Sequence, residues 1–196
     1  MKKGLLIILS GPSGVGKGTV RKQVMKDKTL RLHYSISMTT REKRSREVDG
    51  IDYYFVTNEQ FQKNIDEGNF LEWCEFVGNR YGTPKSKIEE LRNKGENVFL
   101  EIEVNGATQV LEKMGNDEGV VSIFLLPPSI KALENRIRNR RTESEEIIKA
   151  RLEKGKSEMN KVSNYKYIVL NDHVNKASNE ICRIIREEIA ENYRKK

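Results

Sequence analysis

Apolar residues along the chain gather in short runs, and the stretches between these runs place apolar residues at helical spacing. Each run is long enough for one strand and is mostly apolar, with carboxylates only toward the end of one of them, as in a strand buried on both faces. The runs lie at residues 4–9, 98–104, 120–126 and 167–170. We therefore expect each of them to be a core strand.

The stretches between the runs predict helices. Helical patterns follow the first run and cover residues 85–93, 105–113, 129–137, 142–159 and a C-terminal stretch with Ile181, Ile184, Ile185 and Ile189 on one face. Asn105, Ser129 and Thr142 are the expected N-terminal caps. Strands that alternate with helices predict an α/β fold, in which a parallel sheet is covered on both faces.

Residues 36–83 depart from this alternation and hold most of the aromatic residues. Thr57 and Gln60 have the spacing of a capping box, and the helix that they open ends at Gly68. Strand patterns occur at residues 33–37, 53–56 and 70–77, whereas residues 38–47 are polar without a period. We expect residues 36–83 to form a small α/β insertion in the core.

The first strand leads into the loop GPSGVGKGT, in which Gly11, Gly16 and Lys17 have the spacing of a phosphate-binding loop. The glycines let backbone amides converge on one point, and the following helix adds the positive end of its dipole. Lys17 supplies a charge for the outer phosphates. The residues predicted to bind a nucleoside triphosphate are Gly11, Pro12, Ser13, Gly14, Val15, Gly16, Lys17, Gly18 and Thr19.

One position departs from the usual loop pattern. Gly18 follows the lysine where such loops usually have Ser or Thr, and the hydroxyl comes one residue later, at Thr19. Because the hydroxyl directly after the lysine usually contacts magnesium, that contact is in question in this chain.

Composition limits the class of protein. The chain has 196 residues, of which 33% are charged, and its formal net charge is +7, from 36 basic and 29 acidic residues. It is long enough for one substantial core. The first apolar run is much shorter than the ~20 residues of a membrane span and ends in the loop, so we expect neither a signal peptide nor a membrane segment. Cys74 and Cys182 match no metal or redox spacing, and we expect reduced thiols in a cytoplasmic protein.

Charged residues at two places suggest phosphate chemistry. Glu101 and Glu103 stand at the carboxyl end of a predicted strand, where open parallel sheets bind ligands. The basic residues cluster at 41–46 and 136–141, which favours two clamps on phosphate groups over a nucleic-acid surface. Arg21 and Arg31 have no such context, and we interpret both as solvated surface residues.

Taken together, the motifs resemble the guanylate kinase family over nearly the whole chain. The resemblance rests on the loop, Ser37 with Thr39-Thr40-Arg41, Arg44, Glu47, Gly50, Asp52-Tyr53, residues 70–73, Gly78-Asn79, Tyr81-Gly82-Thr83, residues 101–103, residues 127–129, Arg140 with Thr142-Glu143, Arg151-Leu152 and Asn171-Asp172. It implies a P-loop core of residues 1–35, 84–135 and 152–196, a GMP-binding insertion of residues 36–83 and a lid of residues 136–151.

The resemblance implies transfer of the γ-phosphoryl group of ATP to GMP, which gives ADP and GDP. It implies catalytic roles for Lys17, Arg41, Arg140 and Arg151, and contacts of Arg136, Arg140 and Asn171 with ATP. It implies GMP contacts of Ser37, Arg41, Arg44, Tyr53, Glu72, Tyr81, Thr83, Glu101 and Glu103. Mg²⁺ would be held mainly by the nucleotide phosphates and water, with Thr19, Glu101 and Glu103 as further candidates.

The base preference has its own physical reason. Guanine presents two adjacent donors on its pairing edge, which a carboxylate such as Glu72 accepts, and Thr83 can donate to the guanine oxygen. Adenine would leave the carboxylate without a donor. A site built on such hydrogen bonds rejects the wrong base by up to about 10⁴-fold.

Several alternatives stay open at this stage. One is a kinase for another nucleoside monophosphate, another is a guanylate-kinase-like binding module without activity, and a third is a nucleic-acid-binding ATPase, suggested by the +7 charge. We expect ATP and GMP as partners, no nucleic acid and no membrane, and the sequence allows a homodimer.

Overall fold

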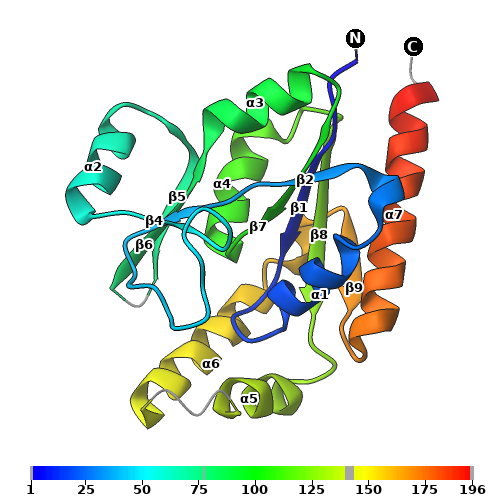
Figure 1. Ribbon diagram of the computed structural model, residues 1–196. Coiled ribbons are helices and arrows are strands. Elements are labelled where there is room, and N and C mark those ends of the chain that lie inside the picture. Colours follow the sequence, from blue (N-terminus) through cyan, green and yellow to red (C-terminus); the bar gives the residue numbers. More distant parts are fainter. Residues whose placement is uncertain (1, 77, 140–143, 195–196) are drawn as a thin grey trace.

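A five-stranded parallel sheet forms the centre of the protein (Figure 1). The computed structural model describes residues 2–76, 78–139 and 144–194. The sheet has the order β2-β7-β1-β8-β9, and all of its pairings are parallel. Its strands are β1 (Leu6–Ser10), β2 (Leu32–Tyr34), β7 (Asn97–Glu101), β8 (Val120–Leu126) and β9 (Tyr167–Leu170).

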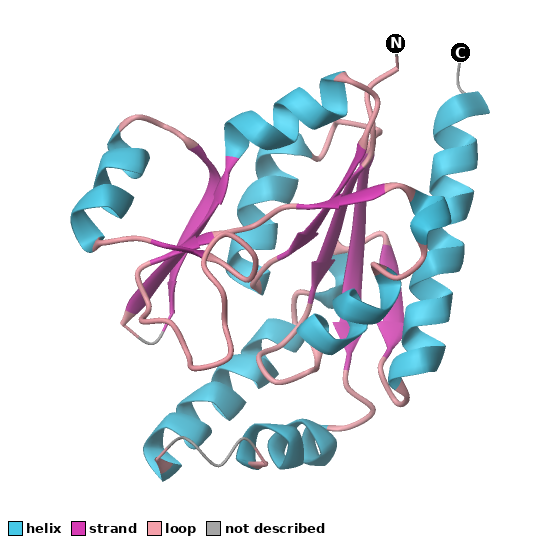
Figure 2. Ribbon diagram, viewed as in Figure 1, coloured by secondary structure: helices cyan, strands magenta, loops and turns pink. Residues whose placement is uncertain are grey.

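Helices cover both faces of this sheet, as the α/β prediction requires (Figure 2). Leu5, Ile7 and Leu9 pack toward the helices α1 (Lys17–Val24) and α7 (Val174–Arg194). Leu6 and Ile8 pack toward the helices α3 (Lys85–Asn93) and α4 (Val104–Met114). Alternate residues of β1 therefore enter two different cores, which is why its sequence is apolar without interruption.

A second, mixed sheet lies beside the core and has the order β4-β3-β6-β5. It consists of β3 (Met38–Thr39), β4 (Tyr54–Phe55), β5 (Phe70–Phe76) and β6 (Asn79–Pro84), with α2 (Asn58–Asp66) packed against it. The capping box of Thr57 and Gln60 is present at the start of α2, as predicted. Both sheets and the helices that cover them confirm the fold class.

The strands of the second sheet were predicted only in part. Residues 38–47 were expected to lack regular structure, but Met38 and Thr39 pair with both neighbouring strands. β6 was not predicted, because its residues Asn79–Pro84 alternate poorly and include Gly82 and Pro84. β6 forms by antiparallel pairing with the preceding strand β5, from Asn79 opposite Phe76 to Pro84 opposite Phe70, and not by an apolar pattern of its own.

Helix starts differ from the prediction at two places. α4 begins at Val104 with Glu103 at the cap position, so the expected cap at Asn105 is wrong, and β7 ends at Glu101 rather than at residue 104. The Ser129 cap of α5 (Ile130–Arg138) is confirmed by a hydrogen bond that its hydroxyl accepts from the amide of Ala132. α6 (Glu145–Met159) begins after the expected cap Thr142, which lies outside the described residues.

Short 3₁₀ turns complete the fold at η1 (Lys28–Leu30) and η2 (Val162–Asn164). No helix among residues 2–76, 78–139 and 144–194 is long and apolar enough to span a bilayer.

One charged side chain is fully buried inside the core. Arg92 of α3 donates from Nε to the carbonyl oxygen of Gly4 at 2.8 Å. Its other nitrogens donate to the Asp117 carboxylate at 3.0 and 3.2 Å. The pairing lowers the pKa of Asp117, against the effect of its partial burial. Arg92 therefore ties the start of β1 to the turn before β8, a role that the sequence did not indicate.

Candidate active site

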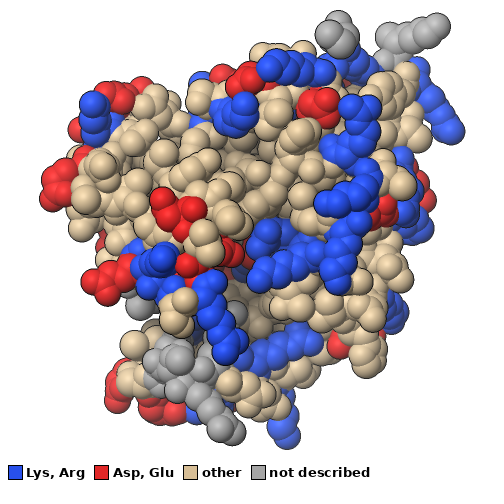
Figure 3. Space-filling view, in the orientation of Figure 1, with Lys and Arg blue, Asp and Glu red and all other residues tan. Residues whose placement is uncertain are grey.

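A cavity of about 430 Å³ opens where the carboxyl ends of the parallel strands face the second sheet. We call it the central cavity. Figure 3 shows lysine and arginine side chains gathered around a hollow in this face of the molecule. The basic residues that line the central cavity are Lys17, Arg21, Lys22, Arg41, Arg44 and Arg151. Such a surface attracts anions.

The phosphate loop forms one wall of the cavity. It connects β1 to α1, and Gly16 caps the helix with a left-handed backbone at φ 102°. Gly11 comes so close to β8 that a Cβ atom there would lie 2.4 Å from the carbonyl oxygen of Leu125. A side chain at either position would force the loop to change shape, and the backbone amides at the start of α1 would no longer face the cavity.

Lys17 folds back over the loop. Its Nζ donates to the carbonyl oxygens of Gly11 at 2.5 Å and Pro12 at 3.3 Å. Both acceptors are neutral, so the charge of the ammonium group remains available to an anion in the cavity.

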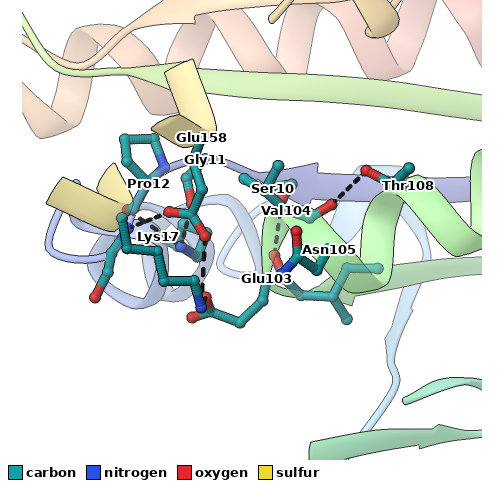
Figure 4. Close-up of polar contacts among 12 residues, drawn as sticks. Ser10, Gly11, Pro12, Lys17, Glu103, Val104, Asn105, Thr108 and Glu158 are labelled. Atoms are coloured by element: carbon teal, nitrogen blue, oxygen red, sulfur yellow. Dashed lines mark hydrogen bonds and ion pairs between the residues drawn. The ribbon is translucent and has the colours of Figure 1, made fainter. Parts of the chain in front are cut away.

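A buried carboxylate supports the loop from behind. Glu158 of α6 accepts a hydrogen bond from the amide of Ser13 at 3.2 Å. Lys154 lies between Glu158 and Glu103, at 3.6 and 3.3 Å. Figure 4 shows Glu103 and Glu158 beside the loop. Burial raises the pKa of Glu158, since it disfavours the charged form. No sequence pattern singles out Glu158, because only the fold brings α6 to the loop.

Opposite the loop, an arginine is held by a carboxylate. Arg41 donates to both oxygens of Glu47 at 2.8 and 2.9 Å, and the Arg44 amide donates to the same carboxylate at 2.9 Å. Tyr53 lies 5.6 Å from the Arg41 guanidinium, and burial raises the pKa of its hydroxyl, which therefore remains a donor. Glu47 thus fixes the position of Arg41 and of the backbone at Arg44. Glu47 is part of the motif that resembles the family, but the motif did not indicate this role.

Deeper in the cavity, Glu72 of β5 is only 3% exposed. Its Oε1 accepts a hydrogen bond of 2.5 Å from the hydroxyl of Thr83, on the paired strand β6. Burial raises the pKa of Glu72 to about 7, partly offset by Thr83 and by the charge of Lys113. Cys74, two residues further along β5, also faces the cavity, and burial raises the pKa of its thiol to about 12.

Arg21 is not a solvated surface residue, so this expectation is wrong. Its Nε donates to Oε2 of Glu101 at 2.8 Å, and only 15% of its side chain is exposed. Its guanidinium lies 4.1 Å from the centre of the Tyr34 ring. The Glu101 carboxylate lies 3.4 Å from where a Cβ of Gly18 would be. The missing side chain at position 18 therefore leaves room for a carboxylate. Arg31, by contrast, is 76% exposed, as expected.

Most of the predicted site residues line this one cavity. They are Ser13, Gly14, Gly16, Lys17, Gly18, Thr19, Ser37, Arg41, Arg44, Tyr53, Glu72, Tyr81, Glu101, Glu103 and Arg151. Residues that the sequence analysis did not select also line it, namely Arg21, Lys22, Tyr34, Glu47, Asp52, Cys74 and Ile102.

The remaining predicted residues lie behind the lining or outside the described chain. Arg136 donates to the carbonyl oxygens of Val15 at 2.9 Å and Asn171 at 2.8 Å, and the Asn171 amide donates to Val15 at 2.8 Å. Both side chains therefore hold the backbone of the phosphate loop in this structure. Thr83 contacts the cavity through Glu72. Arg140 lies outside the described residues.

A metal would need ligands besides protein side chains. Within the described parts of the chain, no three His, Cys, Asp or Glu residues lie close enough together to hold an ion. Thr19, Glu101 and Glu103 nevertheless bring oxygen atoms to the cavity.

Comparison with known proteins places the chain in a family. The sequence model of the family described as guanylate kinase matches residues 3–188. The chain belongs to the guanylate kinase family. A guanylate kinase of Mycoplasma capricolum is 52% identical over 188 residues, which cover 96% of this chain and 62% of the relative. A guanylate kinase of Oceanobacillus iheyensis is 50% identical over 200 residues and is covered to 95% of its length.

A solved guanylate kinase structure has the same fold. The crystal structure of guanylate kinase from Anaplasma phagocytophilum superimposes with a TM-score of 0.79 at 32% identity, covering 95% of this chain and 87% of that one. The family resemblance inferred from the motifs is thereby confirmed. The chain spans only 62–63% of the length of the Mycoplasma and Mesoplasma relatives.

Proposed function

We propose that this protein transfers the γ-phosphoryl group of ATP to GMP and releases ADP and GDP. The observation that carries the proposal is that one cavity combines a phosphate loop, a carboxylate-held arginine pair and a buried carboxylate on the second sheet. These are the parts that a donor phosphate, an acceptor phosphate and a guanine base would each require.

The acceptor nucleotide would bind to the insertion of residues 36–83. Arg41, which Glu47 presents in a fixed orientation, would grip the GMP phosphate together with Arg44. Ser37, Tyr53 and Tyr81 also line the central cavity, and their hydroxyl groups would donate to the oxygens of the GMP phosphate. In its charged form, the Glu72 carboxylate would accept hydrogen bonds from the two adjacent donors of guanine. Thr83 supports this role by hydrogen bonding to Glu72, and its own contact with the base stays a prediction.

The donor nucleotide would bind to the phosphate loop. Backbone amides at the start of α1 and the Lys17 ammonium would cradle its phosphates. Arg136 and Asn171 would act by fixing Val15, and Glu158 by fixing Ser13. Arg151, which lines the cavity, and Arg140, in the proposed lid of residues 136–151, would neutralise charge on the group in transfer.

The side chains present fit Mg²⁺ bound mainly by phosphates and water. Thr19, Glu101 and Glu103 offer oxygen donors, the type that Mg²⁺ prefers, without forming a complete cage. When bound, Mg²⁺ would supply positive charge that offsets part of the negative charge of the phosphates. Arg21 fixes the position of the Glu101 carboxylate, so that its oxygens stay at the end of β7.

ATP and GMP are thus the proposed partners, and the proposed setting is purine nucleotide metabolism in the cytoplasm. The deciding experiment measures ADP formation from ATP and Mg²⁺ with GMP, AMP, UMP and CMP offered separately. Turnover with GMP alone supports the proposal. Turnover with a nucleotide other than GMP would identify that nucleotide as the acceptor substrate. GMP binding without turnover would identify a non-catalytic binding module.

A Glu72→Gln variant separates base recognition from phosphate chemistry. Gln keeps the size of the side chain but offers one acceptor and one donor in place of two acceptors. We expect the KM for GMP to rise by about 10²-fold or more, with little change in the KM for ATP. Equal losses for both nucleotides would contradict the role of Glu72 in reading the base.

A further inference from the structure

β5 carries Glu72 and is an edge strand of the second sheet, since the sheet order ends β6-β5. One side of an edge strand has backbone groups without a strand partner. Here the helix α4, which belongs to the core, lies along that side (Figure 1). Contacts between α4 and this edge can therefore affect the position of Glu72, the residue proposed to bind the guanine base.

A single side-chain amide takes the place of a neighbouring strand. Gln109 donates from Nε2 to the carbonyl oxygen of Trp73 at 2.6 Å. The Trp73 amide in turn donates to Oε1 of Gln109 at 3.4 Å. In an antiparallel sheet, two opposite residues form the same pair of hydrogen bonds, in which each backbone amide donates to the other residue's carbonyl oxygen. The Gln109 side chain therefore binds the outer edge of β5 directly beside Glu72.

A second contact lies two residues away, at the strand period. Lys113 donates from Nζ to the carbonyl oxygen of Leu71 at 3.0 Å. Groups that point to one edge of a strand recur every second residue, so the carbonyl groups of Leu71 and Trp73 both point to the outer edge of β5. These two residues directly precede and follow Glu72 in the chain. The backbone around Glu72 is thus held from α4 on both flanks.

A third member of the same helical stripe touches Glu72 itself. Gly106, Gln109 and Lys113 are spaced i, i+3 and i+7, which places them on one face of α4. A Cβ atom at Gly106 would lie 2.2 Å from Oε2 of Glu72. The carboxylate thus fits between a helix position without a side chain and the Thr83 hydroxyl.

We propose that Gly106 and Gln109 are positioning residues for base recognition, which fix the Glu72 carboxylate by docking the edge of β5 on α4. The inference rests on the proposed function, in which Glu72 reads guanine. Among the described residues that line the central cavity, none belongs to this stripe of α4. Its effect on the acceptor must therefore pass through β5.

The first test replaces Gln109 by Met, which keeps the length of the side chain but removes both hydrogen bonds. We expect the dissociation constant for GMP, measured by calorimetry, to rise about five- to tenfold, as for loss of one or two hydrogen bonds. The KM for ATP should change less than about twofold. Amide exchange at Trp73 should accelerate, which reports directly on the contact. The matched control is Gln62→Met, because Gln62 is an exposed glutamine of α2 outside the cavity lining.

The second test is Gly106→Ala, which adds one methyl group where the Glu72 carboxylate lies. Alanine is the better helix former, so α4 should still form. We expect GMP affinity to fall by about tenfold or more and the preference for GMP over AMP to decrease, while ATP binding is retained.

The outcomes separate the inference from the proposed function. Wild-type protein that neither binds nor phosphorylates GMP would overturn the proposed function. Wild-type turnover of GMP with unchanged GMP affinity in both variants would overturn the inference alone. Equal losses of GMP and ATP binding in Gln109→Met would also overturn it, because they would show a general structural role.

Discussion

The Thr83 hydroxyl donates a 2.5 Å hydrogen bond to the Glu72 carboxylate, and both side chains are almost completely buried. This hydrogen bond favours the charged form of Glu72, whereas burial opposes it and is the larger effect, so the pKa rises to about 7. Glu72 therefore titrates in the range in which an enzyme of this kind would be assayed.

GMP binding should consequently depend on pH. If guanine requires the carboxylate, its affinity increases as pH rises through about 7, because more Glu72 is then charged. We expect the KM for GMP to fall several-fold between pH 6 and pH 8, and the Glu72→Gln variant to lack that part of the change. The variant also corrects for titration of the GMP phosphate. A wild-type profile identical to that of the variant would contradict the assignment.

The same shift predicts an effect on stability. Glu72 has a pKa of 4.5 in the unfolded chain and about 7 in the fold, so the folded state binds the proton more tightly. Protonation of Glu72 therefore stabilises the fold. This contribution to the free energy of unfolding is complete below pH 4.5, is lost as pH rises through 7, and amounts to roughly 3 kcal/mol at most. We expect Glu72→Gln to gain stability relative to wild type between pH 5 and pH 8, as measured by urea unfolding. A constant difference across this range would contradict the shifted pKa.

Lys17→Ala should remove turnover and leave the fold intact. Among the residues that the structure describes, the Lys17 ammonium group donates to the carbonyl oxygens of Gly11 and Pro12 within its own loop. Loss of one charge that stabilises the transition state costs about 10²–10³-fold in rate. Lys26→Ala is the control, because Lys26 is an exposed lysine just beyond α1. A near-normal rate for Lys17→Ala with an unchanged circular dichroism spectrum would contradict the assignment of the loop.

Arg21→Met should lower the rate through Glu101. The substitution removes the 2.8 Å ion pair and leaves a carboxylate without its partner at the end of β7. We expect kcat to fall about tenfold, and the concentration of Mg²⁺ needed for half-maximal rate to change, because the carboxylate is no longer fixed. Arg31→Met is the matched control, since Arg31 is 76% exposed. Equal behaviour of the two variants would contradict a positioning role for Arg21.

Arg92→Met should destabilise the core without affecting the site directly. Arg92 is 1% exposed and bonds to the carbonyl oxygen of Gly4 and to the partly buried carboxylate of Asp117, so its removal takes a donor from both acceptors. We expect a loss of about 3 kcal/mol in the free energy of unfolding. The control Arg183→Met breaks an exposed pair with Glu187 and should cost less than about 0.5 kcal/mol. Similar unfolding midpoints for both variants would show that the buried pair contributes little.

Elements with a local signal could be predicted from the amino-acid sequence alone. The apolar runs predicted the core strands, because consecutive apolar residues suit a strand buried on both faces. Glycine spacing and the lysine predicted the phosphate loop, since its amides converge only where side chains are absent. The predicted caps Thr57 and Ser129 are confirmed, because each cap side chain bonds to an amide in the first turn of its own helix, and this interaction is local in the sequence.

Which polar residues act together depends on how the chain packs in three dimensions. Arg21 and Arg31 look alike in the sequence, yet one pairs with Glu101 in the cavity and the other is exposed. Gln109 and Glu158 carry no motif, and each acts on backbone groups far away in the chain. Hydrogen bonds and ion pairs depend on distances of a few ångströms between distant segments. A local pattern contains no such distance, whereas the packing of two sheets and their helices fixes it.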